Sequence, residues 1–274
     1  MTIQKISVLS FSPTGNTERI ARRIGEIVSQ ELDAPLTEID FTTPAARAKE
    51  YHFTDTDLLI AAFPTYAGKL PNKILPDLKA RLHGDHTLSV SIVTFGNRAF
   101  DNSLAELTAV LTGNGFRVSA AAAFVSRHAF TDAVGTGRPD TDDWREIEAF
   151  AKAAAEKIQA GISGVPAPLS LPGDAAAPYY IPKGTEGQPV NFLKAKPQTD
   201  PSRCCNCGVC ARRCPMGAID TQNVFDVPGI CIKCQSCVRR CTRKAKFFDD
   251  PAFLSHVAML EQNYKDPKEN QTFV

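Results

Sequence analysis

The clearest fold signal in this chain of 274 residues is ISVLSFSPTGNT, residues 6–17. Apolar residues predominate in its first half, as in a strand that is buried in a sheet. Pro13 and Gly15 then mark a turn, and the amphipathic pattern of a helix begins at Asn16. A strand that runs directly into a helix indicates an α/β domain.

The same alternation continues to about residue 159. Buried strands are predicted at 6–10, 58–63, 88–95 and 118–125, with a weaker strand at 36–41. Helices are predicted at 16–31, 72–82, 101–112 and 141–159. Strands that alternate with helices form parallel sheets covered on both faces. Residues 1–160 are therefore predicted to form a doubly wound, five-stranded parallel sheet.

The sequence changes character after residue 160. Residues 161–200 are rich in Gly and Pro, which break regular elements, and are predicted to be an irregular linker. Tyr179, Tyr180 and Phe192 indicate that part of this linker packs along a domain surface. A small cysteine-rich α+β domain is predicted at 201–250. A helix at 251–264 opens the final segment, 251–274.

The overall composition gives no sign of a nucleic-acid or membrane partner. The formal net charge is +1, and no apolar run approaches the roughly 18 residues of a membrane-spanning helix. The first residues already belong to the predicted strand and lack the basic head and cleavage site of a signal peptide. We therefore expect a cytoplasmic protein, and its oligomeric state stays open.

All nine cysteines lie between Cys204 and Cys241, which indicates a metal-binding module. Eight of them repeat the spacing C-x2-C-x2-C-x3-C, and Pro215 follows the first repeat, as in the bacterial motif that ligates [4Fe–4S] clusters. In that motif the fourth cysteine ligates the other cluster. One cluster is therefore assigned to Cys204, Cys207, Cys210 and Cys241, and the other to Cys231, Cys234, Cys237 and Cys214. Two zinc sites are the alternative, although zinc needs no third cysteine at this spacing.

Two residues depart from the motif, and the charge of the module is uneven. Thr242 stands where a proline would follow Cys241, and Cys205 falls outside the spacing and is interpreted as a free thiol. Residues 200–250 contain nine basic and five acidic side chains. This excess either offsets the negative charge of the clusters or forms a docking face for an acidic redox partner.

A phosphate-binding loop is predicted in the turn after the first strand. A phosphate there would meet the free N–H groups at the start of the helix and the positive end of the helix dipole. The loop consists of Ser12, Pro13, Thr14, Gly15, Asn16 and Thr17. Capping of the helix by Thr14 or Asn16, with no ligand, is the alternative.

Two further loops are expected at the same edge of the sheet, because ligands of open α/β sheets bind beyond the carboxyl ends of the strands. After the third strand, Tyr66 could stack on a flavin ring, and Gly68 would let the backbone approach it. After the fourth strand, backbone amides could reach the edge of the ring. The predicted FMN contacts in these loops are Pro64, Thr65, Tyr66, Ala67, Gly68, Thr94, Phe95, Gly96, Asn97 and Arg98.

These motifs resemble two known families in tandem. The loop at 12–17, with its flanking strand and helix, resembles the phosphate loop of flavodoxins, and the likeness extends over residues 1–160. Residues 200–248 resemble dicluster bacterial ferredoxins. The order is similar to that of a family of flavodoxin–ferredoxin fusion proteins. This resemblance implies a flavodoxin-like fold, FMN, two [4Fe–4S] clusters and low-potential electron transfer, largely in anaerobic metabolism.

The leading hypothesis is an electron-transfer protein that passes electrons between the two clusters, FMN and an external redox protein. The alternative is a reductase in which the clusters feed FMN, and FMN reduces a small acceptor such as a quinone or nitro compound. That reaction needs a proton donor, for which His128 and Tyr66 are candidates. A third hypothesis is an interaction protein without cofactors, which the intact cysteine spacing disfavours.

Overall fold

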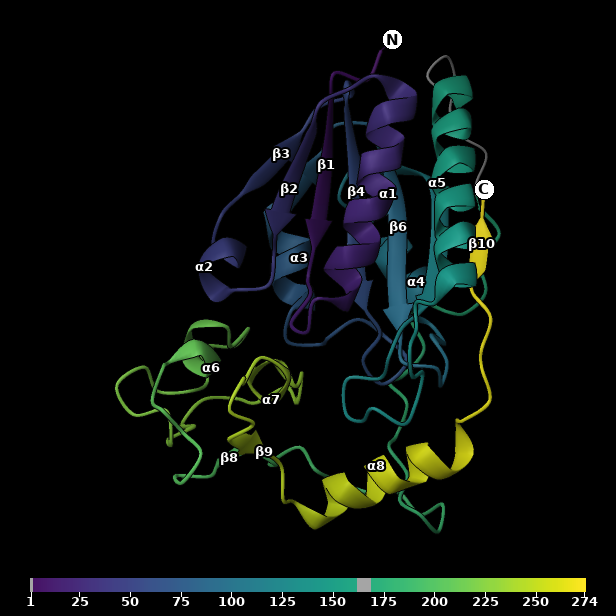
Figure 1. Ribbon diagram of the computed structural model, residues 1–274. Coiled ribbons are helices and arrows are strands. Elements are labelled where there is room, and N and C mark those ends of the chain that lie inside the picture. Colours follow the sequence, from purple (N-terminus) through teal and green to yellow (C-terminus); the bar gives the residue numbers. More distant parts are fainter. Residues whose placement is uncertain (1, 162–168) are drawn as a thin grey trace.

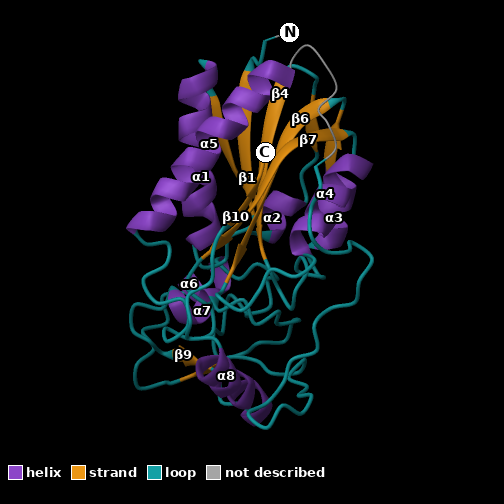
Figure 2. Ribbon diagram, turned by 90° about the vertical axis from the view of Figure 1, so that its right-hand side faces the viewer, coloured by secondary structure: helices purple, strands orange, loops and turns teal. Residues whose placement is uncertain are grey.

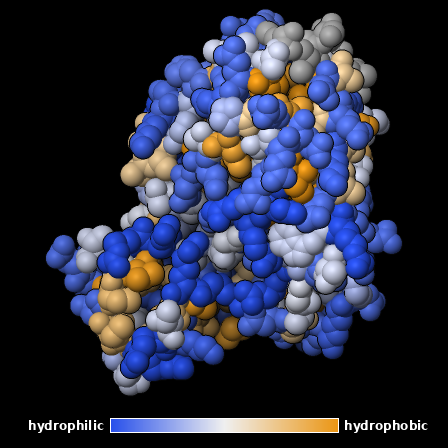
Figure 3. All heavy atoms as spheres, turned by 45° about the horizontal axis from the view of Figure 1, so that its top comes forward, coloured by the Kyte–Doolittle hydropathy of each residue, from blue (hydrophilic) through white to orange (hydrophobic). Residues whose placement is uncertain are grey.

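A central sheet is covered by helices on both faces in the computed structural model, which describes residues 2–161 and 169–274 (Figure 1). Residue 1 and residues 162–168, which include Pro166 and Pro168 of the predicted linker, lie outside the described residues. Among the described helices, none combines the length and the apolar character that crossing a bilayer requires. Hydrophilic side chains predominate on the face shown in Figure 3, with small apolar groups among them.

Five parallel strands form the centre of the sheet: β1 (Lys5–Ser10), β2 (Leu36–Asp40), β4 (Asp57–Pro64), β6 (Thr87–Phe95) and β7 (Phe116–Val125). They confirm the five predicted strands, with small shifts at the ends. Their order is β2-β1-β4-β6-β7, which among these five is the 2-1-3-4-5 order of flavodoxin-like folds. Ligands of such folds bind where the order reverses, beyond the carboxyl ends of β1 and β4.

The predicted helices are also present and cover both faces of the sheet (Figure 2). One face carries α1 (Asn16–Leu32) and α5 (Thr141–Gly161), and the other carries α3 (Leu75–Arg81) and α4 (Ser103–Gly113). Side chains alternate along each strand, so Val8 packs under α1 and Leu9 packs on the opposite face. α3 begins later than predicted, because the N–H groups of Ile74 and Leu75 both bond to Pro71 O in a preceding turn.

The sheet has a sixth strand that corrects the prediction. β10 (Gln271–Phe273) pairs antiparallel with β7, so the sheet is six-stranded and mixed rather than five-stranded and entirely parallel. A strand of three residues is too short to show the alternation that identifies longer strands. It covers the edge of β7, whose backbone groups could otherwise pair with another chain.

Three other short elements are absent from the prediction. α2 (Pro44–Arg47) follows β2, and β3 (Tyr51–Phe53) pairs with β5 (Leu82–Gly84) in a separate parallel sheet of two strands. β5 begins at Leu82, where the predicted helix ends. Each of these strands forms its backbone hydrogen bonds with a partner strand about thirty residues away in the sequence. The local sequence therefore carries little signal for either strand.

The cysteine module lies beyond the carboxyl ends of the parallel strands, whose arrowheads point toward it in Figure 1. It contains α6 (Val209–Arg212), α7 (Ser236–Arg239) and the antiparallel pair of β8 (Gln198–Thr199) with β9 (Lys246–Phe247). The predicted closing helix follows as α8 (Pro251–Asn263), and the Asp250 side chain caps it by accepting the N–H of Phe253.

The described part of the linker is fastened to the sheet domain. Lys69 Nζ donates to the carbonyls of Ala175 and Ala177 at 2.8 Å each, and it pairs with Glu106 at 3.0 Å. Lys69 and Glu106 are both buried. Tyr179 adds a hydrogen bond from its hydroxyl to Leu70 O. This segment is therefore an ordered part of the structure.

Replacing Asn270 with Ala tests how much the final strand stabilises the sheet. The Asn270 side chain accepts the N–H of Val125 at 2.8 Å and donates to Asp143 and Glu146. Loss of these partners should cost about 1–3 kcal/mol, measured as a lower thermal unfolding midpoint. The control is Asn191→Ala, because the exposed Asn191 side chain bonds to its near neighbour Leu193. Equal midpoints for the Asn270 variant and its parent would contradict this role.

Candidate iron–sulfur and flavin sites

The eight predicted cluster ligands fall into two cavities of the cysteine module. The inner cavity encloses about 350 Å³ of empty space, part of it open to solvent, and its cysteines are Cys214, Cys231, Cys234 and Cys237. The outer cavity encloses about 380 Å³, and its cysteines are Cys204, Cys205, Cys207, Cys210 and Cys241. Leaving Cys205 aside, these are the two sets that the motif assigns to separate clusters. The structure therefore brings each predicted set together, including the cysteine that crosses from the other repeat.

The two short helices of the module produce this crossing. α6 begins after Gly208 and α7 after Gln235, and both of these residues have left-handed backbones with φ of 71° and 63°. Each helix carries the chain from three cysteines at one cavity to the fourth cysteine at the other. A Cβ at position 208 would lie 2.7 Å from Arg212 Nη1, which favours glycine there.

The turns after the two crossing cysteines are equivalent despite the missing proline. The N–H of Ala218 bonds to Cys214 Sγ at 3.3 Å, and the N–H of Ala245 bonds to Cys241 Sγ at 3.2 Å. Thr242 therefore leaves the position of Cys241 intact. Backbone N–H groups that point at cysteine sulfur are among the features that set the potential of an iron–sulfur cluster.

Burial affects the inner thiols most strongly. It raises the pKa of Cys234 well above its ordinary value and the pKa of Cys237 to about 12. By contrast, the N–H of Val209 lowers the pKa of the exposed Cys207 thiol. Metals bind thiolates, so loading of the inner cavity would release protons.

The spacing of the sulfur atoms does not suit zinc. Zinc–sulfur bonds of about 2.3 Å in a tetrahedron place the sulfur atoms about 3.8 Å apart. Among the described residues, which include all nine cysteines, the only three His, Cys, Asp or Glu ligand atoms within 4.8 Å of one another belong to Glu50, His52 and His83. In the described residues, no three cysteine sulfurs therefore lie as close together as a tetrahedral zinc site requires.

The predicted phosphate loop leads directly into the N-terminus of α1. Gly15 precedes the first turn of α1 with φ 92°, and no side chain caps it, so capping by Thr14 or Asn16 is wrong. Ser12 Oγ accepts the N–H of Glu18 at 3.0 Å instead. No acceptor within the described residues takes the N–H groups of Asn16 and Thr17. These donors fit a phosphate.

Hydroxyl groups adjoin the same loop. Thr17 Oγ1 lies 2.7 Å from Thr94 Oγ1, and both side chains are buried. Asn16 donates from its side chain to Arg127 O at 3.3 Å. The loop therefore joins the carboxyl ends of β1, β6 and β7.

The predicted stacking residue, Tyr66, lies in the loop that follows β4. Residues 66–69 form a tight turn in which Tyr66 and Lys69 exchange backbone hydrogen bonds of 2.8 and 3.1 Å. Burial raises the pKa of Tyr66 well above its ordinary value, and the Cys234 and Cys231 thiolates raise it further. Gly68 has φ 78°, and a Cβ there would lie 2.4 Å from Asp101 Oδ2.

Two side chains of the loop after β6, Asn97 and Arg98, contact other parts of the chain. Asn97 is buried, and its amide donates to the carbonyls of Tyr264 and Asp266 while its oxygen accepts the N–H of Lys268. The Arg98 guanidinium stacks 4.1 Å from the ring centroid of Tyr180. The side chains of Asn97 and Arg98 are therefore engaged within the chain, and backbone contact of this loop with a flavin ring stays a prediction.

The remaining loop positions serve the sheet and its core. Thr65 donates its N–H to Thr94 O at 2.7 Å and shares a hydroxyl contact with Ser103, directly after Pro64 ends β4. Phe95 packs against Phe100 in the core. The predicted flavin contacts thus lie in loops at one edge of the sheet. These are the predicted phosphate loop after β1 and the two loops after β4 and β6 that are predicted to face the flavin ring.

Arginines that the sequence analysis missed fasten the module to this edge. Arg240 Nε donates to Pro13 O in the phosphate loop at 2.9 Å. Buried Arg47 donates to Pro215 O at 2.5 Å, and Arg239 donates to Ala129 O at 3.0 Å. Single arginines in polar segments carry no motif, so these contacts had no recognisable signal in the sequence.

His128, the candidate proton donor, is held uncharged. Its Nδ1 accepts the N–H of Phe130 at 3.1 Å, and a Cβ at Gly96 would lie 2.4 Å from its Cδ2 atom. Close packing lowers the pKa of His128 to about 3, and the neighbouring His256, Arg98 and Arg239 lower it as well. The imidazole therefore carries no extra proton to donate near neutral pH.

The cysteine module also matches a known family. Residues 197–220, which contain the first repeat, match the model of the 4Fe-4S binding domain. A search among curated proteins found no match.

Solved structures resemble the sheet domain. A flavodoxin from the domain Archaea is 13% identical with a TM-score of 0.38, covering 57% of this chain and 99% of that chain. The Megasphaera elsdenii flavodoxin is 17% identical with a TM-score of 0.34, covering 55% and 98%. An NADH:FMN oxidoreductase is 20% identical with a TM-score of 0.41, covering 56% and 89%. With likenesses this distant, the flavodoxin-like fold rests on the strand order of this chain itself.

The chain thus joins a flavodoxin-like α/β domain to a 4Fe-4S domain. This is the arrangement of a flavodoxin–ferredoxin fusion, as the sequence predicted. It supports a redox or electron-transfer role.

The pKa of His128 predicts an acid-sensitive fold. Between about pH 6.5 and pH 3 the unfolded chain binds a proton at this position while the folded chain does not, so stability falls as pH falls. From pH 6.5 to 5 the loss should be about 2 kcal/mol. His128→Asn keeps an acceptor for Phe130 but does not titrate. Its unfolding midpoint should therefore fall less over this range than that of the parent; equal falls would refute the prediction.

Proposed function

We propose that this chain is an electron-transfer protein that holds FMN and two [4Fe–4S] clusters and passes low-potential electrons between them and an external redox protein. The observation that supports this most directly is the grouping of the eight motif cysteines at two cavities, the inner of which packs on the apolar cluster of the sheet domain. A flavin stacked on Tyr66 would adjoin the cluster of the inner cavity. FMN exchanges one or two electrons, whereas each cluster exchanges one.

The two cavities define an order for the electron path. Met216 and Ile232 line the inner cavity and also pack on the apolar cluster of the sheet domain, so this cavity is the one nearer the flavin. At the outer cavity, Cys205 and Cys207 are exposed. In the proposed path the outer cluster exchanges electrons with the partner, and the inner cluster relays them to or from FMN.

FMN would be held by the edge of the sheet domain. The unpaired N–H groups of Asn16 and Thr17 and the hydroxyls of Ser12 and Thr14 would bind its phosphate. Tyr66 would stack on the ring, and the backbone of residues 96–98 would face its edge.

The boundaries 1–160, 161–200, 201–250 and 251–274 remain our proposed division of the chain. The tail contributes β10 to the sheet of the first domain, so the last unit would be a structural part of the flavodoxin-like domain.

A basic rim surrounds the proposed electron port at the outer cavity. Arg243 lines the outer cavity, the Arg212 side chain reaches Gly208 in its wall, and Arg203 and Lys244 are the exposed sequence neighbours of Cys204 and Arg243. In the described part of the chain, the ion pairs of the module involve Arg213 and Arg239 rather than these four. Free positive charge around an exposed cysteine suits an acidic redox protein, because opposite charges speed encounter.

Cofactor analysis of cysteine variants tests the cluster assignment. After anaerobic purification the parent should contain about eight irons and one FMN. Cys234→Ser and Cys207→Ser, from the inner and outer sets, should each lose about four irons. The control is Cys205→Ser, which should keep the parent content. Zinc in place of iron, or equal iron loss from the Cys205 variant, would refute the assignment.

Charge reversal at the rim tests the electron port. With a reduced acidic ferredoxin as donor at low salt, Arg212→Glu/Arg243→Glu should lower the second-order rate of reduction roughly tenfold and weaken its salt dependence. Arg145→Glu/Lys152→Glu makes the same change in charge on exposed positions of α5. An equal loss in that control would show a general charge effect. Fast saturating turnover of a quinone would instead favour the reductase.

A further inference from the structure

Two stacked histidines lie outside the cysteine module, on the small sheet of β3 and β5. His52 and His83 are register partners on these parallel strands, so their side chains leave the same face of the sheet. The two ring centroids are 4.7 Å apart, and the ring planes differ by 16°. This arrangement presents two imidazoles side by side to solvent.

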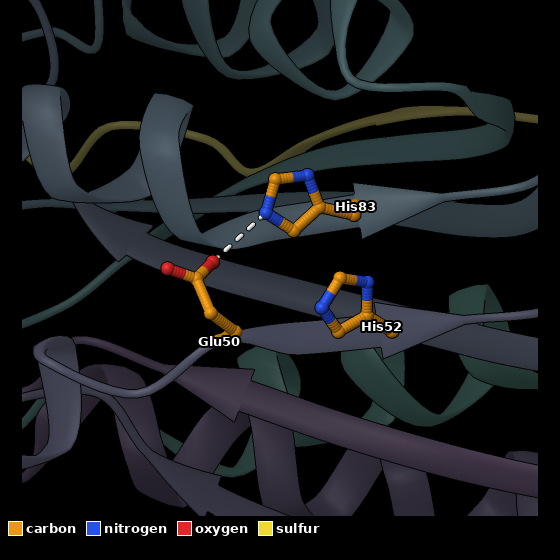
Figure 4. Close-up of side chains that lie close together, drawn as sticks. All are labelled: Glu50, His52 and His83. Atoms are coloured by element: carbon orange, nitrogen blue, oxygen red, sulfur yellow. Dashed lines mark hydrogen bonds and ion pairs between the residues drawn. The ribbon is translucent and has the colours of Figure 1, made fainter.

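Glu50 adds a carboxylate to this pair. Its Oε2 lies 2.9 Å from His83 Nε2. Glu50, His52 and His83 each offer one ligand atom, and these atoms all lie within 4.8 Å of one another. Figure 4 shows that each imidazole turns one nitrogen toward the side of the Glu50 carboxylate.

The cluster is open to ions from solvent. The side chains of His83 and Glu50 are 46% and 42% exposed, and His52 is also exposed. Hydrogen bonds from His83 and then Arg81 lower the pKa of Glu50, so its carboxylate is ionised near neutral pH. Arg81 also pairs with the other oxygen of Glu50 and would compete with a bound cation.

We propose that Glu50, His52 and His83 form a binding site for one divalent transition-metal ion of the zinc type, with water in the remaining positions. Two imidazoles and one carboxylate suit such ions, whereas Mg²⁺ prefers oxygen ligands. Zinc bonds of about 2.0–2.2 Å place ligand atoms about 3.4 Å apart, so modest rotations of exposed side chains complete the site.

The local fold gives this ion a structural role. β3 and β5 pair over three residues each, and a short two-stranded sheet is weak by itself. A metal bridge between His52 and His83 would join the two strands through their side chains. The pairing of the two strands already brings the imidazoles together, so an ion would add a bond to a geometry that the fold supplies. This proposal does not rest on the electron-transfer function.

The test is a calorimetric titration of the anaerobically purified full-length chain with Zn²⁺, with the visible spectrum recorded so that exchange at the cysteines is detected. The parent should bind Zn²⁺ but not Mg²⁺, with an increase in its unfolding midpoint. His52→Ala and His83→Ala should each weaken Zn²⁺ binding roughly tenfold or more. Arg81→Gln should strengthen it, because Glu50 is released from its ion pair.

The matched control is His86→Asn, which removes an exposed histidine of the following turn while keeping a residue that tolerates its left-handed backbone, φ 54°. This variant should bind Zn²⁺ like the parent. The proposal is overturned if the parent binds no Zn²⁺ while the visible spectrum, which reports the metal bound at the cysteines, is unchanged. It is also overturned if His52→Ala and His83→Ala bind Zn²⁺ as tightly as the His86 variant.

Discussion

Arginine side chains that donate to main-chain carbonyls hold the cysteine module against the carboxyl edge of the sheet. The Arg47 guanidinium is buried, and it bonds to the carbonyls of Thr42 in the sheet domain and Pro215 in the module. Arg47 also pairs with Asp77 at 2.7 Å, so its charge is satisfied within the sheet domain and the bond to Pro215 O attaches the module to it. A hydrogen bond from a charged group contributes about 1.5–3 kcal/mol. A second contact, from Arg240 to Pro13 O, holds the module on the loop before α1. These bonds set the position of the module at the carboxyl edge of the sheet.

Other distant segments reinforce this edge. Lys69, which pairs with the buried Glu106, donates to linker carbonyls, and the Asn97 side chain donates to carbonyls of the tail. Each of these polar groups would be costly to bury alone, and each is satisfied by chain from another region. The linker and tail therefore act as parts of the sheet domain's edge.

Burial makes the two cavities chemically different. The inner cysteines include two buried thiols, Cys234 and Cys237, whereas the outer cavity opens at the exposed Cys207. Solvent exposure, N–H···S bonds and nearby charge all tune the potential of an iron–sulfur cluster. The same ligand spacing can thus produce two sites of different potential. The exposed Arg243 lines the outer cavity.

The sequence by itself was sufficient to predict the five parallel strands, the main helices and the grouping of the cysteines into two sets. Those signals are local: apolar runs, helical periodicity and fixed spacing act over a few residues. It did not reveal β10, the β3–β5 pair, Arg47 or the meeting of His52 with His83. These features form between residues about thirty to more than a hundred positions apart. Their energy comes from burial and pairing that exist only once the chain has folded, so the tertiary structure decided them.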